Sequence, residues 1–382
     1  MCCLVDRENS PSPDGERGPG GEVLAVPPRR AVLSANALRV GVVGCGYWGP
    51  NLVRNFARHP QSQVQAVCDT RYERATRVGA EYRIPTVTDR AEELIKAPDL
   101  DLVVIATPSF THFDLAKAAI AAGKHVLVMK PLTTNAEQAE ELCALAERQG
   151  VLLAVDHTFV FTGAVRKMKQ LIDAGEVGEL YYFDSVRINL GLIQTDVNVI
   201  WDLAPHDVSI MDHLIGQEPV SVSAIGASHG GSPAESIAYV TVRYAGSLLG
   251  HIHVNWLAPA KVRRTILGGA KRMIIYDDME SSEKVKIYDK GFTVAPHPSP
   301  EDEYRLLISY RVGDMHAPQI DAKEALAVEA DNIVRAVQGS EPLVADGWAG
   351  WRVVRILEAA QRSIGRDGAP LAPASRSAAR PR

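Results

Sequence analysis

The first part of the chain, from Arg39 to Val155, alternates short apolar runs with amphipathic stretches. The apolar runs are RVGVVG, VQAVCD, DLVVIATP, HVLVMKP and VLLAVDH, and segments such as THFDLAKAAIAAG and NAEQAEELCALAERQG lie between them. Gly123 and Gly150 stand where two amphipathic segments end, as glycine commonly does at helix C-termini. Nearly continuous apolar strands that alternate with helices predict a parallel sheet buried on both faces.

After about Phe161 the apolar positions recur at every second residue instead. The segments with this period are ELYYFDSVRINL, VSVSAIGAS, SIAYVTVRYA, SLLGHIHVNW and RRTILGG. Such alternation predicts antiparallel strands that bury one face of the sheet and leave the other open. Two amphipathic segments, KEALAVEADNIVRAVQG and WAGWRVVRILEAAQRSIG, predict helices at the end of the ordered chain.

The two ends of the chain lack apolar periodicity. Residues 1–37 and 366–382 are rich in Pro, Gly, Arg and other polar residues, which predicts a disordered leader and a disordered tail. Two folded domains are therefore expected at 38–158 and 159–365, with the terminal helices of the second packing back on the first.

Composition narrows the class of protein. Of 382 residues, 46% are hydrophobic and 23% charged, as in globular proteins. The net charge of −5 is spread along the chain, which argues against a nucleic-acid partner, and no apolar run reaches the ~18 residues of a membrane span. The five cysteines form no CxxC pair or Cys/His cluster, so we expect neither a disulfide framework nor a metal, and a cytoplasmic location.

Three glycines, Gly44, Gly46 and Gly49, follow the first apolar run and open the first amphipathic segment. This G-x-G-x-x-G spacing serves a tight turn, a close approach of pyrophosphate, and helix packing on the strand. Asp69 ends the second run, 20 residues after Gly49, where a carboxylate accepts the adenosine ribose hydroxyls and repels a 2′-phosphate. The pattern predicts an NAD-binding Rossmann domain, although Arg71 keeps NADP open as an alternative.

Three residues are candidates for chemistry. Lys130 precedes a proline at the carboxyl end of a strand, the edge at which open α/β sheets bind ligands. Asp202 and His206 are four residues apart on a helix that we expect to begin near Asp202, because Pro205 is tolerated only in a first turn. A histidine beside a carboxylate can accept a hydroxyl proton. The alternatives are a solvated lysine, an aspartate cap and a packed histidine.

The combination of the glycine turn, Lys-Pro at a strand end and Asp-x-x-x-His opening a later helix resembles the Gfo/Idh/MocA oxidoreductase family. The resemblance covers about residues 39–365 and implies an α/β Rossmann domain followed by an α+β domain with a large open, mostly antiparallel sheet. It implies that Lys130 polarises the reacting hydroxyl, that His206 is the general acid/base, and that Asp202 orients it or the substrate. It also implies that the segment ATPSFTH contacts the cofactor through Thr107, Pro108 and His112.

The segments GCGYWGPN, RINLG, WDLAPHD and NWLAPAKVRR resemble the nucleotide-sugar 3-dehydrogenase branch of that family. This implies that Tyr47 and Trp48 line the cofactor and substrate side of the turn; the alternative is that they pad the helix against the sheet. One departure is Met129, because the family usually has a glutamate before Lys-Pro and a thioether cannot accept the ribose hydrogen bonds of a carboxylate.

The second domain adds candidate substrate contacts. Arg187 and Asn189 lie on one face of a strand, where an arginine can clamp a diphosphate or sugar carboxylate; the alternative is a cross-strand ion pair. His251 and His253 share a strand face but lack a third metal ligand, so a polar sheet face or a subunit interface is favoured. The open sheet predicts a homo-oligomer, and the resemblance implies a homodimer or homotetramer.

These observations favour an NAD-dependent oxidoreductase that oxidises a sugar hydroxyl. The resemblance implies C3 of a UDP-linked hexose or hexuronate, ahead of transamination in amino-sugar or antibiotic biosynthesis. His206 would accept the proton and Lys130 stabilise the developing alkoxide while hydride departs. Three alternatives remain: a free-sugar or inositol dehydrogenase, a ketoreductase of nucleotide sugars, and a non-catalytic NAD-binding sensor.

Overall fold

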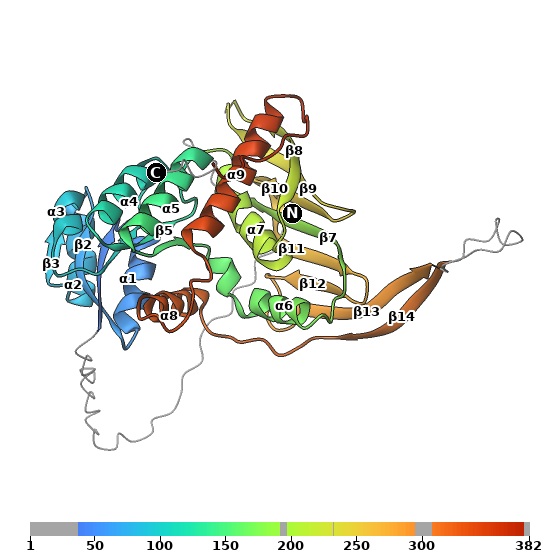
Figure 1. The fold of residues 1–382 in the computed structure, drawn as a ribbon, viewed down its shortest axis with the longest axis horizontal. Helices are drawn as coiled ribbons and strands as arrows, with labels where there is room; N and C mark the ends of the chain where they lie inside the picture. Colours follow the sequence, from blue (N-terminus) through green and yellow to red (C-terminus); the bar gives the residue numbers. More distant parts are fainter. Residues whose placement is uncertain (1–36, 192–196, 232, 295–307, 378–382) are drawn as a thin grey trace, which may run out of the picture. The chain divides into compact units, whose positions relative to one another are not determined.

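The structure is a computed structural model that describes residues 37–191, 197–231, 233–294 and 308–377 (Figure 1). The predicted leader, 1–37, lies almost wholly outside these ranges. The N-terminal domain contains a six-stranded parallel sheet of order β3-β2-β1-β4-β5-β6. Its strands are β1 (Leu38–Val43), β2 (Ser62–Cys68), β3 (Thr86–Thr88), β4 (Leu102–Ile105), β5 (His125–Met129) and β6 (Leu153–Asp156). Its helices are α1 (Gly49–Arg58), α2 (Tyr72–Tyr82), α3 (Ala91–Lys96), α4 (His112–Ala121) and α5 (Ala136–Gln149).

This domain confirms the predicted parallel sheet. The central strands β1 and β4 are buried on both faces, which is why their sequences are almost continuously apolar. Helix α5 begins where the Asn135 side chain accepts a hydrogen bond from Gln138 N, and it ends at Gly150 in the left-handed conformation. The short strand β3 was not predicted, because its sequence TVT carries no apolar run.

The second domain contains an eight-stranded sheet of order β14-β13-β12-β11-β7-β10-β9-β8. Strand β10 runs parallel to β7, and the other neighbours are antiparallel, so the predicted mostly antiparallel sheet is confirmed. Its strands are β7 (Leu180–Leu190), β8 (Pro219–Ser228), β9 (Glu235–Tyr244), β10 (Leu249–Asn255), β11 (Leu257–Gly269), β12 (Met273–Asp277), β13 (Val285–Val294) and β14 (Ile308–His316). Strands β12 to β14 were not among the predicted segments.

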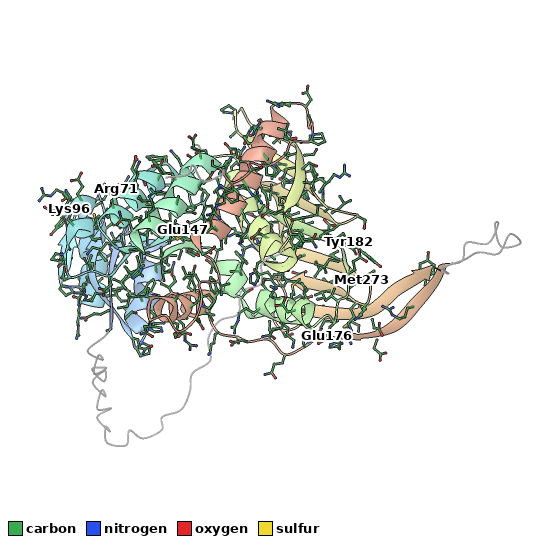
Figure 2. All side chains as sticks on the ribbon, in the orientation of Figure 1. Arg71, Lys96, Glu147, Glu176, Tyr182 and Met273 are labelled. Atoms are coloured by element: carbon green, nitrogen blue, oxygen red, sulfur yellow. The ribbon has the colours of Figure 1, made fainter. Side chains whose placement is uncertain are left out.

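The described chain after β6 also contains the helices α6 (Gly163–Asp173), α7 (Val199–Ile215), α8 (Ala325–Val337) and α9 (Gly347–Ile364). Helix α7 packs on the inner face of the sheet against β7, β9 and β10. Helix α8 lies against α1, and α9 contacts both α5 and β8, so the last helices join the two domains (Figure 1). Trp348 of α9 donates to Glu147 of α5, which Figure 2 labels, at 2.7 Å. No helix within the described ranges is long and apolar enough to cross a bilayer.

Helix α7 begins earlier than the sequence predicted. Its N-cap is Asn198, whose side chain accepts a hydrogen bond from Trp201 N, and Pro205 lies inside the helix. Pro205 cannot donate a backbone hydrogen bond to the carbonyl of Trp201, four residues earlier. The expected start near Asp202 is therefore wrong by three residues, because the Asn198 cap decides where the helix begins.

The predicted disordered tail is also wrong for residues 366–377. Leu371 exchanges two backbone hydrogen bonds with Val222 of β8, at 2.8 and 2.9 Å. Arg376 then lies 3.7 Å from the ring centre of Trp348, and Ser377 N donates to Glu140 of α5. These contacts join the tail to residues far away in the sequence, so local composition could not predict them.

Candidate active site

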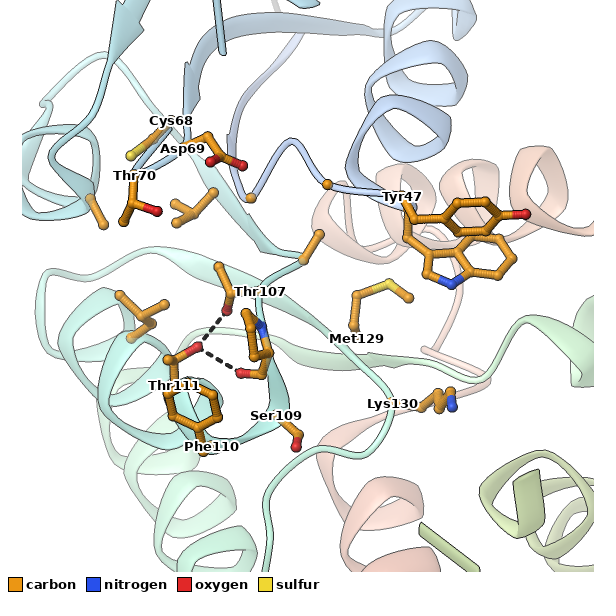
Figure 3. Close-up of a pocket in the computed structure, with 18 of the residues that line it drawn as sticks. Tyr47, Cys68, Asp69, Thr70, Thr107, Ser109, Phe110, Thr111, Met129 and Lys130 are labelled. Carbon is orange, nitrogen blue, oxygen red and sulfur yellow. Dashed lines mark hydrogen bonds between the residues drawn. The ribbon is translucent and has the colours of Figure 1, made fainter. Parts of the chain in front are cut away.

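A cavity of about 1030 Å³ opens at the carboxyl ends of β1, β2, β4 and β5 (Figure 3). This is the edge of a parallel sheet at which ligands bind. Asp69 lies toward one end of the cavity and Lys130 toward the other (Figure 3). The second domain contributes Val197, which precedes α7, and Trp201 and Asp202 from the first turn of that helix. Both domains therefore form the wall of one site.

The glycine turn has the geometry that its spacing predicts. Gly44 has φ +100°, and a Cβ there would lie 2.4 Å from the carbonyl oxygen of Ala106. A Cβ on Gly49 would lie 1.9 Å from the carbonyl oxygen of Gly44. A Cβ on Gly46 would meet nothing within 4 Å, because it would point into open space at the cavity. Gly44 and Gly49 are thus required by the turn itself, whereas Gly46 leaves room for a ligand.

Asp69 is 8% exposed and is fixed by the turn beside it. Its Oδ2 accepts a hydrogen bond from Cys45 N at 2.7 Å, and its Oδ1 accepts one from Arg71 N at 2.9 Å. Each carboxylate oxygen has a second lone pair, which can accept a hydroxyl of a ligand. Arg71 is exposed and lines the same end of the cavity.

Tyr47 and Trp48 line the cavity and do not pack between α1 and the sheet. Tyr47 is 84% exposed and Trp48 44%, and their rings meet edge to face at 5.3 Å. The padding alternative is thus wrong. Figure 3 shows Tyr47 above Met129 at the Lys130 end of the cavity.

The segment after β4 contributes Thr107 and Pro108 to the cavity, but His112 lies behind it. The two ring nitrogens of His112 face the carbonyl oxygens of Pro131 and Thr107, at 2.8 and 2.9 Å. Burial lowers the pKa of His112, and the two carbonyl contacts act in the opposite direction. The structure therefore gives His112 no direct access to a ligand; it ties the Thr107 loop to the segment that follows Lys130.

Lys130 projects from the end of β5 toward α7. Its Nζ donates to the backbone carbonyl of Asp202 at 2.6 Å and lies 3.5 Å from Asp202 Oδ1. Burial lowers the pKa of Lys130, and the charge of Asp202 opposes that effect. Met129 also lines the cavity, and its side chain is otherwise buried in the core of the N-terminal domain. A lysine in this position is not a solvated surface charge.

Asp202 and His206 lie four residues apart on α7, but no hydrogen bond joins them within the described residues. Asp202 Oδ2 accepts a hydrogen bond from Trp256 Nε1 at 2.9 Å. His206 packs edge to face on Phe159 with ring centres 4.9 Å apart, and its Nδ1 is buried with no partner among the described residues. Asp202 is thus held by Trp256 and Lys130, and does not orient His206 directly.

The surroundings of His206 favour its neutral form. The pKa of His206 lies well below 6.5, first because the ring is buried and then because of nearby positive charges on Lys130, Arg187 and Arg263. A neutral imidazole can accept a proton at its one unprotonated nitrogen, as a general base requires. His206 does not line the cavity of Figure 3, although the charge of Lys130 reaches it.

Arg187 is a buried residue with a partner that sequence reasoning missed. Its Nε donates to Asp207 Oδ2 at 2.5 Å, and Ser185 Oγ donates to Asp207 Oδ1 at 2.6 Å. The guanidinium lies 4.4 Å from the ring centre of Phe159, and Nη1 is buried without a partner among the described residues. The cross-strand ion pair is therefore wrong, because Asp207 belongs to α7. Asn189 lies two residues further along β7 and is half-buried.

Three further buried polar residues were missed. Asp156 is the last residue of β6, His157 follows it, and Glu329 lies on the buried side of α8; each is at most 2% exposed. A signal was present in the sequence VLLAVDHT, where an acid and a histidine end a strand beside the strand of Lys130. Within the described ranges no group of three His, Cys, Asp or Glu side chains is arranged to hold a metal ion.

Two regions of the chain match sequence models of the two domains of one protein family. Residues 38–157 match "Oxidoreductase family, NAD-binding Rossmann fold", and residues 165–275 match "GFO/IDH/MocA C-terminal domain".

Individual proteins agree with these matches. The UDP-N-acetylglucosamine 3-dehydrogenase of Acidithiobacillus ferrooxidans is 30% identical over 328 residues, which cover 83% of this chain and 94% of that protein. A solved structure of that enzyme, GnnA, aligns with a TM-score of 0.73 at 26% identity and covers 86% of this chain and 98% of its own. The WlbA dehydrogenase of Bordetella pertussis, solved with NADH and UDP-GlcNAcA, shares the fold with a TM-score of 0.74 at 21% identity, covering 90% and 99%.

A relative with another substrate matches a shorter stretch. The scyllo-inositol 2-dehydrogenase (NAD(+)) of Bacillus subtilis is 31% identical over 198 residues, which cover 50% of this chain and 57% of that protein.

Proposed function

Because the chain belongs to the GFO/IDH/MocA oxidoreductase family, we propose that it is an NAD-dependent dehydrogenase that oxidises a hydroxyl of a nucleotide sugar. The observation that carries this proposal is the position of Lys130 in a cavity whose other end holds the carboxylate of Asp69. An adenosine ribose at Asp69 and a reacting hydroxyl at Lys130 would occupy the two ends of one site.

The residues present fit an NAD molecule rather than NADP. Gly46 leaves open space for a pyrophosphate, and the N-terminus of α1 follows directly. Asp69 is held in place by two backbone N–H groups, so its charge would repel a 2′-phosphate. Thr107, Pro108 and Arg71 complete the walls, and Tyr47 and Trp48 cover the Lys130 end. NAD, when bound, supplies the hydride acceptor.

The chain's own residues supply proton transfer and charge stabilisation. Neutral His206 accepts the proton of the substrate hydroxyl. The Lys130 ammonium donates a hydrogen bond to the same oxygen and stabilises the negative charge that develops there. Asp202 holds Lys130 by its carbonyl oxygen and is itself fixed by Trp256. His112 supports both the Thr107 loop and the backbone after Lys130.

The relation to UDP-N-acetylglucosamine 3-dehydrogenase supports a UDP-linked sugar as the substrate and C3 as the oxidised carbon. Arg187 Nη1 is buried near His206 without a partner among the described residues, which favours Arg187 as a donor to the sugar, and Asn189 extends the same strand face. A 3-keto product is the substrate that a transaminase needs to form a 3-amino sugar.

The test is the absorbance of reduced nicotinamide. Purified protein is mixed with NAD or NADP and with UDP-sugars, dTDP-sugars, free glucose or inositol. We expect this absorbance to increase with NAD and a UDP-sugar. A signal only with free glucose or inositol would overturn the nucleotide-sugar assignment. NADH binding without any turnover, unchanged by Lys130→Ala and His206→Ala, would indicate a sensor.

We further propose that the protein assembles through the outer face of its eight-stranded sheet. This face carries exposed apolar residues on three neighbouring strands: Ile225 (65% exposed), Tyr239 (44%) and Leu249 (45%). Exposed apolar groups on one sheet face mark an interaction site.

A further inference from the structure

Two buried acids, Asp156 and Glu329, lie within hydrogen-bonding reach of each other next to the proposed catalytic lysine. Asp156 is paired with Met129 across β5 and β6, so it stands directly beside the residue that precedes Lys130. Glu329 belongs to the face of α8 that packs on this end of the sheet, together with Leu326 and Ala330. Asp156 is 1% exposed and Glu329 2%, so water cannot screen their charges.

Their hydrogen bonds do not account for two negative charges. Asp156 Oδ1 accepts hydrogen bonds from Thr158 N at 3.0 Å and from Thr158 Oγ1. Asp156 Oδ2 and both oxygens of Glu329 are buried without a donor among the described residues. Two ionised carboxylates offer no donor to each other, so these three buried oxygens would remain unpaired. One proton on Glu329 supplies the missing donor to Asp156 Oδ2.

The asymmetry of the two environments decides which acid keeps the proton. Burial raises the pKa of Asp156, but the two donors from Thr158, the hydrogen bond with Glu329 and the positive charge of Lys130 each favour its ionised form. Glu329 has no such donor among the described residues. Burial is the main cause that raises the pKa of Glu329 well above the ordinary value, and the negative charge of Asp156 raises it further. Asp156 in turn favours the charged form of Lys130, whose pKa burial lowers.

We propose that Asp156 and Glu329 share a single proton, held on Glu329, and that the remaining charge on Asp156 adds to that of Asp202 in keeping Lys130 protonated while Lys130 binds the substrate hydroxyl. Asp156 is thus a positioning residue, since it acts through Lys130. The part that concerns Lys130 rests on the proposed dehydrogenase activity, whereas the shared proton does not.

Other charged and titratable groups near the two acids also affect the pKa of Lys130. Asp202 of α7 faces Lys130 with a second carboxylate, and Arg187 of β7 opposes it with a positive charge. His157, next to Asp156, has its pKa lowered to about 3 by burial and by the charges of Arg352 and Lys130, so it is neutral. Asp156 therefore adds to Asp202 in balancing the charge of Lys130.

The first test follows the pH dependence of hydroxyl oxidation in the full-length protein at saturating NAD. Deprotonation of Lys130 produces the alkaline limb of kcat/KM. Asp156→Asn keeps the contacts with Thr158 but removes the charge, so we expect this limb to move to lower pH by about 1 unit. Glu329→Gln has an amide that donates to Asp156 as the neutral acid does, so we expect its limb to stay in place. Glu341→Gln, at an acid that binds α8 through Asn332, is the matched control.

The results distinguish a positioning role of Asp156 from a purely structural one. Equal loss of activity at every pH in Asp156→Asn, without a shift of the limb, would mean that Asp156 is only structural. A shift in Glu329→Gln as large as that in Asp156→Asn would mean that Glu329 is ionised, and would overturn the shared proton.

The second test needs no substrate. Infrared spectra of the wild type are expected to show a carboxylic-acid C=O band at neutral pH that Glu329→Gln abolishes, and its absence would overturn the shared proton. NMR of 13C-labelled lysine, assigned with Lys130→Met, is expected to show a lower pKa of Lys130 in Asp156→Asn. If these signals appear while no sugar is oxidised, the proposed function fails and the acid pair stands.

Discussion

At the scale of single residues, the candidate site places a neutral imidazole and a cation close together in a buried environment. Burial and the charges of Lys130, Arg187 and Arg263 lower the pKa of His206 well below 6.5. A lowered pKa means that the imidazole stays unprotonated as pH falls through 6.5. Since oxidation requires the unprotonated base, we expect kcat/KM for oxidation to stay level through pH 6.5 and to fall only at clearly lower pH. An acid limb at or above pH 6.5 would contradict this environment.

Substitution of the same residue tests its role. We expect His206→Ala to lower kcat by about 10²- to 10⁴-fold, as loss of a general base does, with NADH binding unchanged by fluorescence titration. His213→Ala is the control, because His213 lies on the same helix and its pKa is also lowered by burial. Similar losses in the two variants would show that α7 is disturbed and that His206 has no special part in catalysis.

The buried pair of Arg187 and Asp207 gives a prediction on stability. Asp207→Ala leaves the guanidinium of Arg187 buried without its counter-charge, so we expect the free energy of unfolding to fall by about 3–5 kcal/mol in urea denaturation. Asp289→Ala breaks an exposed pair with Arg311 and is expected to cost at most about 1 kcal/mol. Equal effects would mean that the burial of Arg187 is not maintained in solution.

At the scale of elements, the glycine turn contains one glycine that the fold requires, Gly49, and one that leaves space for a ligand, Gly46. A methyl group at Gly49 would collide with the Gly44 carbonyl, whereas one at Gly46 would enter the cavity. We therefore expect Gly49→Ala to lower the melting temperature. Gly46→Ala is expected to leave it unchanged but to weaken NADH binding by about 10-fold or more, because the methyl group takes space that a pyrophosphate needs. Unchanged NADH affinity in Gly46→Ala would place the cofactor elsewhere.

The elements also show what the sequence could predict. The parallel sheet and its glycine turn follow from local patterns, since apolar strands and G-x-G-x-x-G each act within a few residues. The start of α7 could not be predicted in this way. The Asn198 cap begins the helix seven residues before Pro205, although proline is generally disfavoured inside a helix. The candidate site residues Lys130, Asp202 and His206 were proposed from motifs, but the contacts of Asp202 with Trp256 and of Arg187 with Asp207 join separate elements. No periodicity encodes such contacts.

At the scale of the whole molecule, residues 366–377, which follow α9, are ordered although their composition predicts disorder. Its Pro, Ala and Arg residues resemble those of disordered tails, yet Leu371 pairs with β8 and Arg376 stacks on Trp348. Pairing with β8 also covers part of an edge strand, which would otherwise offer free hydrogen-bonding groups to another chain. The tail and α9 together connect the eight-stranded sheet with α5 of the first domain.

The open face of that sheet gives the last prediction. Ile225, Tyr239 and His253 are neighbours across β8, β9 and β10, and Tyr239 stacks on His253 with ring centres 4.4 Å apart. If a second copy covers this row, Tyr239→Glu buries an unpaired charge in the interface, which costs about 2 kcal/mol or more and raises the dissociation constant roughly 30-fold or more. Sedimentation velocity is then expected to show a dimer or tetramer for the wild type and monomers for the variant. Tyr72→Glu, at an exposed tyrosine on α2, is the control. A wild-type monomer at micromolar concentration would leave the outer face without the partner we propose, and would require another reason for its exposed apolar side chains.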